Sequence, residues 1–472
     1  MGITTQIIGL IASLSFLVFT HELGHYFFAR IFKVRVEKFY LFFNPGFSIL
    51  RAKKYDGKWH FSFFSSKSPA DFDEHPDVTE WGIGWLPLGG YCSIAGMVDE
   101  TTKPGELPAE PQPWEYRTKP AWQRLFIITG GVLVNFLSAL VLYVVILFTW
   151  GEDFIPMQNA KYGFYFSKAA QEAGFQNGDQ ILSADGVTYE KLGDLTSYVL
   201  IDDCQRVKVL RMKADTNVAD TVTVYLNASF PKKIIGSEKS EQFFCQFNVP
   251  YVADSVIKDS PAEKAGLRKD DSVVAINGQS VFPYYDYVKT LSQMPKKSVK
   301  ISYYRDNQVD TVNVVLDENG KMGVAAKGLG HYFESKHLDY GFFSSIPHGI
   351  ARGFSTLGDY VKQFKLIFSK EGATQLGGFG TIGSIFPKVW DWQIFWNMTA
   401  FLAVILAFMN VLPIPALDGG YILFILVEMI TRRKPSDKLI GYANTIGFIL
   451  LFALLIYANG LDILRWLGIN LS

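Results

Sequence analysis

Four long apolar stretches divide the chain, and each one is free of the regular alternation that marks a half-buried strand. They extend over residues 3–32, 125–150, 392–412 and 439–461. About 20 helical residues cross a hydrocarbon core of ~30 Å. A fifth run, 421–430, is too short to span, and it predicts a re-entrant or interfacial helix. The pattern predicts a polytopic α-helical membrane protein with four transmembrane helices.

Composition agrees with this prediction. Charged residues make up 19% of the 472 residues, below the roughly 25% of soluble domains. The 45 Lys+Arg balance the 45 Asp+Glu, which argues against a strongly basic nucleic-acid binder or a polyacidic tail protein. The three cysteines are too few for a disulfide scaffold, although Cys204 and Cys245 could pair in an oxidising compartment.

Basic residues next to the spans orient them. Arg and Lys gather between residues 30 and 54 and again between 432 and 438. Loops rich in Arg and Lys lie on the cytoplasmic side of a membrane. Both termini and the stretch 151–390 are therefore expected on the opposite side.

The long segment between the second and third spans contains a repeat. Residues 170–186 recur at an offset of 92 residues as 262–278, and each copy predicts a short helix, a turn, a buried strand and a tight Asp-Gly or Asn-Gly hairpin turn. Two small β-rich folds explain this pattern without any binding role. The signature also resembles bacterial PDZ domains, whose groove binds extended peptide. We expect PDZ-like domains over residues 151–247 and 248–330.

Two weaker patterns follow the repeats, within 331–390. Apolar residues from 346 to 367 recur at three- and four-residue steps, as in an amphipathic helix that packs on a core or lies at a membrane interface. Glycines 378, 380 and 383 form a G-x-G-x-x-G without a preceding strand. A turn that leads into the third span is a better prediction than a dinucleotide site.

The first span contains the strongest chemical signal, His21-Glu22-Leu23-Gly24-His25. Residues i and i+4 share one face of a helix, so two imidazoles at this spacing can bind one Zn²⁺. Glu22 lies close enough to take a proton from water at the metal. Two buried structural histidines are the alternative, but ionisable groups within a span are costly and are usually functional.

A catalytic zinc site needs a third protein ligand and one open position. No other histidine lies in a suitable segment. Asp418 follows a stretch broken by Pro413 and Pro415, and such irregular backbone is tolerated in a membrane only where it lines protein or water. Alone, Asp418 reads equally well as a helix cap. Together with H-E-x-x-H, the ligand interpretation is favoured.

H-E-L-G-H in the first span, N-x-x-P-x-P-x-L-D-G-G at residues 410–420 and PDZ-like repeats between the second and third spans together resemble the site-2 protease family, in particular its bacterial members with tandem PDZ domains. The resemblance implies a zinc-dependent intramembrane endopeptidase. Its ligands would be His21, His25 and Asp418, with Glu22 as general base. Asn410 would contact the substrate backbone.

Further segments are similar to those of the family. Residues 84–91 resemble its membrane-dipping hairpin, which makes Gly89 and Gly90 candidate substrate contacts. The second span usually carries G-P-x-x-N, and here Gly131-Val132-Leu133-Val134-Asn135 lacks the proline. Asn135 is still expected to contact substrate. Besides the two PDZ-like domains, we expect the chain to divide into five segments, residues 1–35, 36–120, 121–150, 331–390 and 391–472.

The resemblance also implies partners and a location. The substrates would be single-span membrane proteins such as anti-sigma factors, together with remnant signal peptides, and the PDZ pair would gate their access. The protein would be a multi-pass component of the bacterial cytoplasmic membrane, with the PDZ pair on the periplasmic side and no nucleic-acid partner. A transporter with a structural zinc and a non-catalytic zinc-binding scaffold that presents PDZ grooves remain the alternatives.

Overall fold

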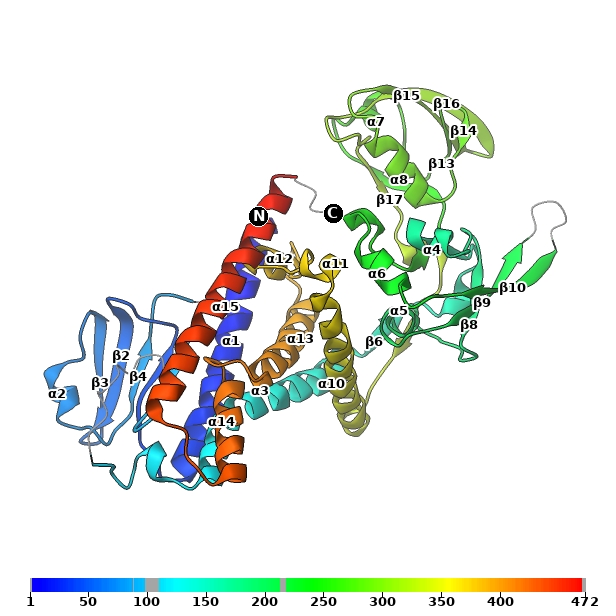
Figure 1. The fold of residues 1–472 in the computed structure, drawn as a ribbon. Coiled ribbons are helices and arrows are strands. Elements are labelled where there is room, and N and C mark those ends of the chain that lie inside the picture. Colours follow the sequence, from blue (N-terminus) through cyan, green and yellow to red (C-terminus); the bar gives the residue numbers. More distant parts are fainter. Residues whose placement is uncertain (1, 88, 98–109, 213–217, 469–472) are drawn as a thin grey trace. The chain divides into compact units, whose positions relative to one another are not determined.

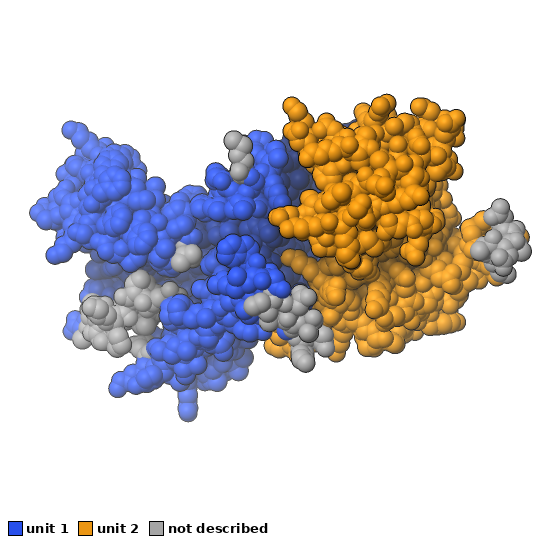
Figure 2. All heavy atoms as spheres, turned by 90° about the horizontal axis from the view of Figure 1, so that it is seen from above, with its two compact units in different colours: residues 1–151, 339–365, 374–471 blue, residues 152–338, 366–373, 472 orange. Residues whose placement is uncertain are grey.

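The computed structural model describes residues 2–87, 89–97, 110–212 and 218–468. The chain forms two compact units, coloured separately in Figure 2. Unit 1 consists of residues 1–151, 339–365 and 374–471, and unit 2 consists mainly of residues 152–338, with 366–373.

The predicted spans are confirmed as four helices of unit 1 that are long and apolar enough to cross a membrane. They are α1 (Gly2–Ile31), α3 (Ala121–Trp150), α13 (Trp392–Val411) and α15 (Asp437–Trp466) (Figure 1). The short apolar run becomes α14 (Asp418–Thr431), which at 14 residues is too short to join them.

Glycines bring α1 and α3 into backbone contact. A Cβ on Gly24 of α1 would lie 2.2 Å from the carbonyl oxygen of Gly130, and one on Gly130 would lie 2.6 Å from the oxygen of Gly24. Small residues at a membrane helix crossing permit this close approach. The crossing lies one residue before His25, so it sets which groups of α3 face the histidines.

The amphipathic helix is α10 (Phe342–Phe364), and it packs on α3 through its small residues. A Cβ on Gly349 would meet the backbone nitrogen of Val144 at 2.6 Å. Phe343 and Phe354 remain exposed at 84% and 55%. One face of α10 therefore serves packing, while apolar side chains elsewhere on it stay uncovered.

The glycine-rich stretch is a short helix, α12 (Phe379–Ser384), so the predicted turn is wrong. Its first N–H groups are satisfied by α15. The N–H of Phe379 donates to Asn459 Oδ1 at 3.1 Å, and the N–H of Thr381 donates to Asp462 Oδ2 at 2.9 Å. Caps of this kind supply partners for the free donors at a helix start. α11 (Lys370–Ala373) belongs to unit 2.

A five-stranded sheet of order β3-β2-β4-β1-β5 follows α1 within unit 1. Its strands, together with the short helix α2, are β1 (Val36–Leu41), β2 (Ser48–Tyr55), β3 (Lys58–Ser65), α2 (Ala70–Asp73), β4 (Glu80–Ile83) and β5 (Tyr91–Ile94). β1 is parallel to β4 and antiparallel to β5. A buried ion pair, Arg51 Nη1 to Glu80 Oε1 at 2.8 Å, joins β2 to β4. β5 is left as an edge strand.

Unit 2 holds both repeats, and their predicted short helices, strands and turns are confirmed. The strand that was predicted to be buried is only partly so, because Leu182 in the first copy is 41% exposed. The first contains β7 (Phe164–Phe166), α4 (Lys168–Glu172), β8 (Gln180–Ala184), α5 (Leu192–Ile201), β9 (Arg206–Met212), β10 (Ala219–Tyr225), α6 (Phe230–Ile235) and β11 (Cys245–Phe247). The second contains β12 (Tyr251–Val256), α7 (Pro261–Lys264), β13 (Ser272–Ile276), β14 (Gln279–Ser280), α8 (Tyr284–Ser292), β15 (Ser298–Arg305), β16 (Gln308–Val315) and β17 (Val324–Ala326). After α9 (Leu329–Tyr332), β18 (Lys336–Leu338) pairs with β6 (Glu152–Phe154).

The turns within the repeats also match. Asp185 and Gly186 have φ values of 46° and 87°, and Asn277 and Gly278 have 50° and 80°. Positive φ at both central residues is what a type I′ hairpin turn requires, and Asp-Gly and Asn-Gly are the pairs that tolerate it.

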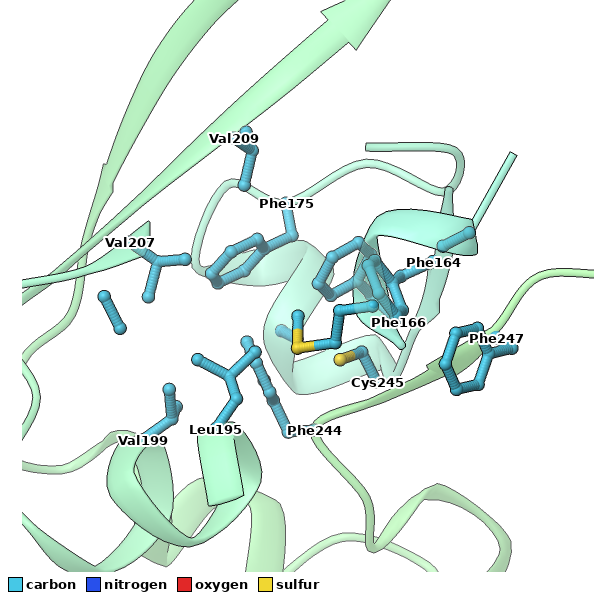
Figure 3. Packing of buried hydrophobic residues seen from close by; sticks show 14 of the residues in the cluster. Phe164, Phe166, Phe175, Leu195, Val199, Val207, Val209, Phe244, Cys245 and Phe247 are labelled. Atoms are coloured by element: carbon cyan, nitrogen blue, oxygen red, sulfur yellow. The ribbon is translucent and has the colours of Figure 1, made fainter. Parts of the chain in front are cut away.

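Each repeat has its own hydrophobic core. In the first, Phe164, Phe166, Phe244 and Cys245 belong to the same buried cluster (Figure 3). Cys204 belongs to the same cluster, yet all three cysteines of the chain are free, so the two do not pair. Burial and the nearby carboxylate of Asp185 raise the pKa of the Cys204 thiol to about 12, which keeps it protonated.

A buried ion pair is duplicated along with the fold. In the first repeat, Asp179 is 1% exposed and accepts two bonds from Arg211, at 2.8 Å and 2.6 Å, while Arg211 also donates to the carbonyl of Gly174. In the second, Asp271 and Arg305 repeat this arrangement at 2.8 Å and 2.7 Å. The clamp joins the turn before β8 to β9 in the first copy, and the turn before β13 to β15 in the second.

We expect Arg305→Leu to destabilise the second repeat, because it leaves the Asp271 carboxylate buried without its partner. Breaking such a pair costs about 3–5 kcal/mol, so hydrogen exchange of the β13 amides should quicken by about 100-fold or more. The control is Lys296→Ala, which removes an ion pair with Glu318 whose partners are 69% and 81% exposed. Equal exchange in the two variants would show that the clamp contributes nothing to stability.

Candidate metal centre

Three side chains of unit 1 converge at one point. His21 and His25 lie one turn apart on α1, and Asp418 is the first residue of α14. The Nε2 atoms of the two histidines are 3.2 Å apart, and Asp418 Oδ2 lies 3.2 Å from His21 Nε2 and 3.5 Å from His25 Nε2. Among the residues that the structure describes, this is the one His, Cys, Asp or Glu group able to hold a metal ion.

The spacing of these atoms fits a tetrahedral cation. Ligands about 2.0–2.1 Å from a tetrahedral zinc lie about 3.3 Å from one another. Asp418 Oδ2 is buried and accepts no hydrogen bond from the described part of the chain, although two ring nitrogens lie within 3.5 Å of it. An orphaned carboxylate oxygen that faces two imidazole nitrogens is the donor set expected of a zinc site.

The broken end of α13 presents the carboxylate. α13 ends at Val411, and α14 begins after a loop that contains both prolines. The N-cap of α14 is Leu417, so Asp418 is not the cap, and its negative charge lies at the positive end of the helix dipole. Residue 419 has to be a glycine, because a Cβ there would lie 1.9 Å from the carbonyl oxygen of Leu412.

Asn444 of α15 stabilises this loop and the start of α14 through two hydrogen bonds. Its Oδ1 accepts the N–H of Ala416 at 3.3 Å, and its Nδ2 donates to the hydroxyl of Tyr421 at 2.5 Å. Three residues further along α15, a Cβ on Gly447 would meet the oxygen of Pro415 at 1.9 Å. The sequence analysis missed Asn444, although an Asn within an apolar span is itself a signal of function.

One face of α3 backs the two histidines. Residues 127, 131 and 135 follow one another at four-residue steps, so they share a face of the helix. His25 Nδ1 lies 2.9 Å from the carbonyl oxygen of Ile127, and a Cβ on Gly131 would lie 2.5 Å from His25 Nε2. A carbonyl acceptor at Nδ1 fixes the tautomer that leaves Nε2 free for a metal. Asn135 lies beside His21, with 3.4 Å between Asn135 Nδ2 and His21 Nδ1.

Glu22 lies beside the three-atom cluster and contacts the sheet. Its carboxylate lies near His21, His25 and Asp418, and the backbone N–H of Cys92 faces it. Cys92 belongs to β5, opposite Phe39 of β1. The edge strand therefore presents a backbone N–H to Glu22, a contact that no sequence pattern indicated.

The remaining candidate residues lie outside these contacts. Asn410 is buried as the penultimate residue of α13. The nearest neighbour of Gly89 is the ring of Phe43, while Gly90 packs against Tyr40 and Val18. The close contacts of both glycines are thus with the sheet, its flanking loop and α1 rather than with the three ligand atoms.

Comparison with known proteins assigns this arrangement to a family. A family model described as peptidase family M50 matches residues 9–66 and 69–454, which is nearly the whole chain. The chain belongs to peptidase family M50. This is the site-2 protease family, so the resemblance predicted from the motifs is confirmed.

The M50 peptidase is similar to bacterial proteins along its full length. It is 26% identical over 98% of the chain to a protein of Neisseria meningitidis serogroup A that carries the name of a zinc metalloprotease, and covers 99% of that protein. It is 26% identical over 96% of the chain to the regulator of sigma E protease of Haemophilus influenzae, and covers 98% of it. A zinc metalloprotease by name from Vibrio cholerae is 27% identical, with 97% and 98% covered.

Family and relatives together define the class of activity. The M50 peptidase is a zinc-dependent metalloprotease and a multi-pass membrane protein. This confirms the enzyme and the cofactor that the sequence predicted, and it excludes the transporter and the non-catalytic scaffold.

Proposed function

We propose that this M50 peptidase cleaves single-span membrane proteins within the bilayer, with His21, His25 and Asp418 as zinc ligands and Glu22 as general base. The observation that carries the proposal is the convergence of three ligand atoms, two from the span α1 and one from the start of α14, with Glu22 beside them. Three protein ligands leave a fourth position for water or substrate, as a catalytic zinc requires.

The roles of the residues follow from their positions. Zinc supplies Lewis-acid chemistry at this site, because it polarises a carbonyl and acidifies water. Glu22, oriented by the N–H of Cys92, takes the proton of the attacking water and passes it to the nitrogen of the leaving amine. The backbones of α1 and α3, in contact at Gly24, keep bulk water from the rear of the histidines.

The substrate has to be an extended strand when it reaches these groups, because the peptide bonds of a helix are already paired. β5 is an edge strand, and its residue Cys92 contacts Glu22. β3 forms the other edge of the sheet, but β5 is the edge beside the base. We propose that an unwound substrate segment adds to β5, with Asn410 and the backbone around Gly89 and Gly90 as further contacts.

The repeats of unit 2 are proposed to be PDZ domains that act as a size filter. They would lie on the periplasmic side of the bacterial cytoplasmic membrane and exclude substrates that retain a folded outer domain. Anti-sigma factors are the substrate class suggested by the name of the Haemophilus influenzae relative, and remnant signal peptides are a second class of the same topology.

The test uses the purified full-length protein in detergent with a single-span substrate in two forms, one with a short outer segment and one with a folded outer domain. We expect cleavage of the short form, loss of cleavage to background with a chelator, and recovery on addition of zinc. The long form should be cleaved more slowly once the protein is reconstituted in bilayers. Cleavage that persists in protein shown by metal analysis to hold no zinc would overturn the proposal.

A further inference from the structure

Asn135 is enclosed between α3 and α1. Its side chain is 0% exposed. Its Oδ1 lies 2.8 Å from the hydroxyl oxygen of Thr20, and its Nδ2 lies 3.4 Å from Nδ1 of His21. A side chain without accessible surface and with a polar neighbour at each end of its amide is poorly placed to contact a substrate, which is the role that the family motif implied.

The protonation of His21 decides what Asn135 can do. His21 Nε2 faces His25 and Asp418, so a metal ligated by His21 takes the lone pair of Nε2. A neutral imidazole then carries its proton on Nδ1, and this N–H needs an acceptor. An amide NH₂ that faces this N–H would place two hydrogen-bond donors opposite each other, with no acceptor between them.

A half-turn of the Asn135 amide removes the conflict, because it exchanges the oxygen and the nitrogen without moving the side chain. His21 Nδ1–H then donates to Asn135 Oδ1, and Asn135 Nδ2 donates to Thr20 Oγ1. The Thr20 hydroxyl keeps an acceptor, since the carbonyl oxygens of Phe16 and Leu17 both lie 3.0 Å from it. Each contact in the chain of bonds then joins one donor to one acceptor.

We infer that Asn135 is a positioning residue for the metal centre: its amide oxygen accepts Nδ1–H of His21 and so leaves Nε2 free for zinc. It does for His21 what the carbonyl of Ile127 does for His25. The inference rests on the zinc ligands proposed above. Loss of such an outer partner lowers metal affinity by about 10–100-fold.

The test is a zinc titration of the full-length protein in detergent against a chromophoric competing chelator. Asn135→Leu keeps the approximate shape and removes the acceptor, so its zinc affinity should fall by about 10–100-fold. Asn135→Asp keeps an acceptor oxygen toward His21 and should retain affinity close to that of the wild type. Thr399→Val is the matched control, since Thr399 is 0% exposed on α13 and its hydroxyl donates to the carbonyl of Phe395 in the same helix.

Unchanged zinc affinity in Asn135→Leu would overturn the inference and favour a role in substrate binding, which would then appear as a raised KM at saturating zinc. Equal losses in Asn135→Leu and Asn135→Asp would also overturn it. If Asn135→Leu does not fold, Thr20→Val is the variant to test instead, because it removes the hydroxyl that orients the Asn135 amide. It should weaken zinc binding by less than Asn135→Leu, and unchanged affinity in Thr20→Val counts against the inference.

The same titration separates this inference from the proposed ligand set. His25→Ala removes one of the proposed ligands directly. If the wild type binds zinc and His25→Ala binds it equally well, the proposed metal site is wrong. If His25→Ala loses zinc while Asn135→Leu keeps it, the site stands and only the role of Asn135 fails.

Discussion

Glu22→Gln is expected to abolish measurable proteolysis while the protein still binds zinc. General acid–base catalysis contributes about 10²–10⁴-fold, and Glu22 would supply both the base and, later, the acid. The substitution keeps the shape of the side chain and an oxygen that can accept the N–H of Cys92. The loss would therefore report the missing proton acceptor rather than a displaced side chain. Cleavage of a single-span substrate and zinc content are measured on the same preparation.

A Glu-to-Gln substitution at a second position serves as the control for this experiment. Glu37 lies on β1, 47% exposed, and reaches Arg35 only at 4.0 Å. Glu37→Gln should cleave at the wild-type rate. Wild-type cleavage by zinc-loaded Glu22→Gln would mean that another group takes the proton, and the general-base assignment would have to be withdrawn.

The convergence of His21, His25 and Asp418 was largely predictable, because the main determinant is local. The spacing of His21 and His25 places both imidazoles on one helix face whatever the helix packs against. Asp418 needed a second argument, since a carboxylate after a broken helix can equally well be a cap. The structure removes the cap alternative, because Leu417 occupies the cap position.

The groups that orient the triad were not predictable, because they come from other elements. Ile127 and Asn135 reach the histidines only because glycines let α1 and α3 touch at that level. The N–H of Cys92 reaches Glu22 because the sheet ends in β5. Nothing in the local sequence around Glu22 indicates that a backbone group 70 residues later will hold it.

The errors in the fold prediction have the same origin. The glycine-rich stretch that predicted a turn forms α12 because Asn459 and Asp462 of α15, about 80 residues away, bond its first N–H groups. α15 itself runs from 437 to 466, beyond the apolar window of 439–461, because polar residues such as Asp462 and Arg465 continue the helix. Hydropathy marks the apolar core of a helix, and tertiary partners set where helices form and end.

Gly131→Ala is expected to cost the protein its zinc, and with it all cleavage. The added Cβ would lie 2.5 Å from His25 Nε2 and 2.7 Å from His21 Cε1, distances that real Cβ contacts do not reach. α3 cannot retreat from α1 without shifting α10 and α13, which also pack on it. The imidazole rings must therefore move, and a displacement of about 1 Å at a catalytic centre is enough to cost about 100-fold.

The matched control is the same substitution where the helix has room. A Cβ on Gly441 of α15 would meet no atom within 4 Å, so Gly441→Ala should keep zinc and activity and add up to about 1 kcal/mol of helix stability. Zinc content, zinc affinity and cleavage are compared for both variants after each is shown to be monodisperse in detergent. Tight zinc binding by Gly131→Ala would mean that the histidines bind the metal from a position further from α3, and the outer contacts of Ile127 and Asn135 would then lose their role too. The absence of a side chain at residue 131 thus allows one face of α3 to lie against both histidines at once.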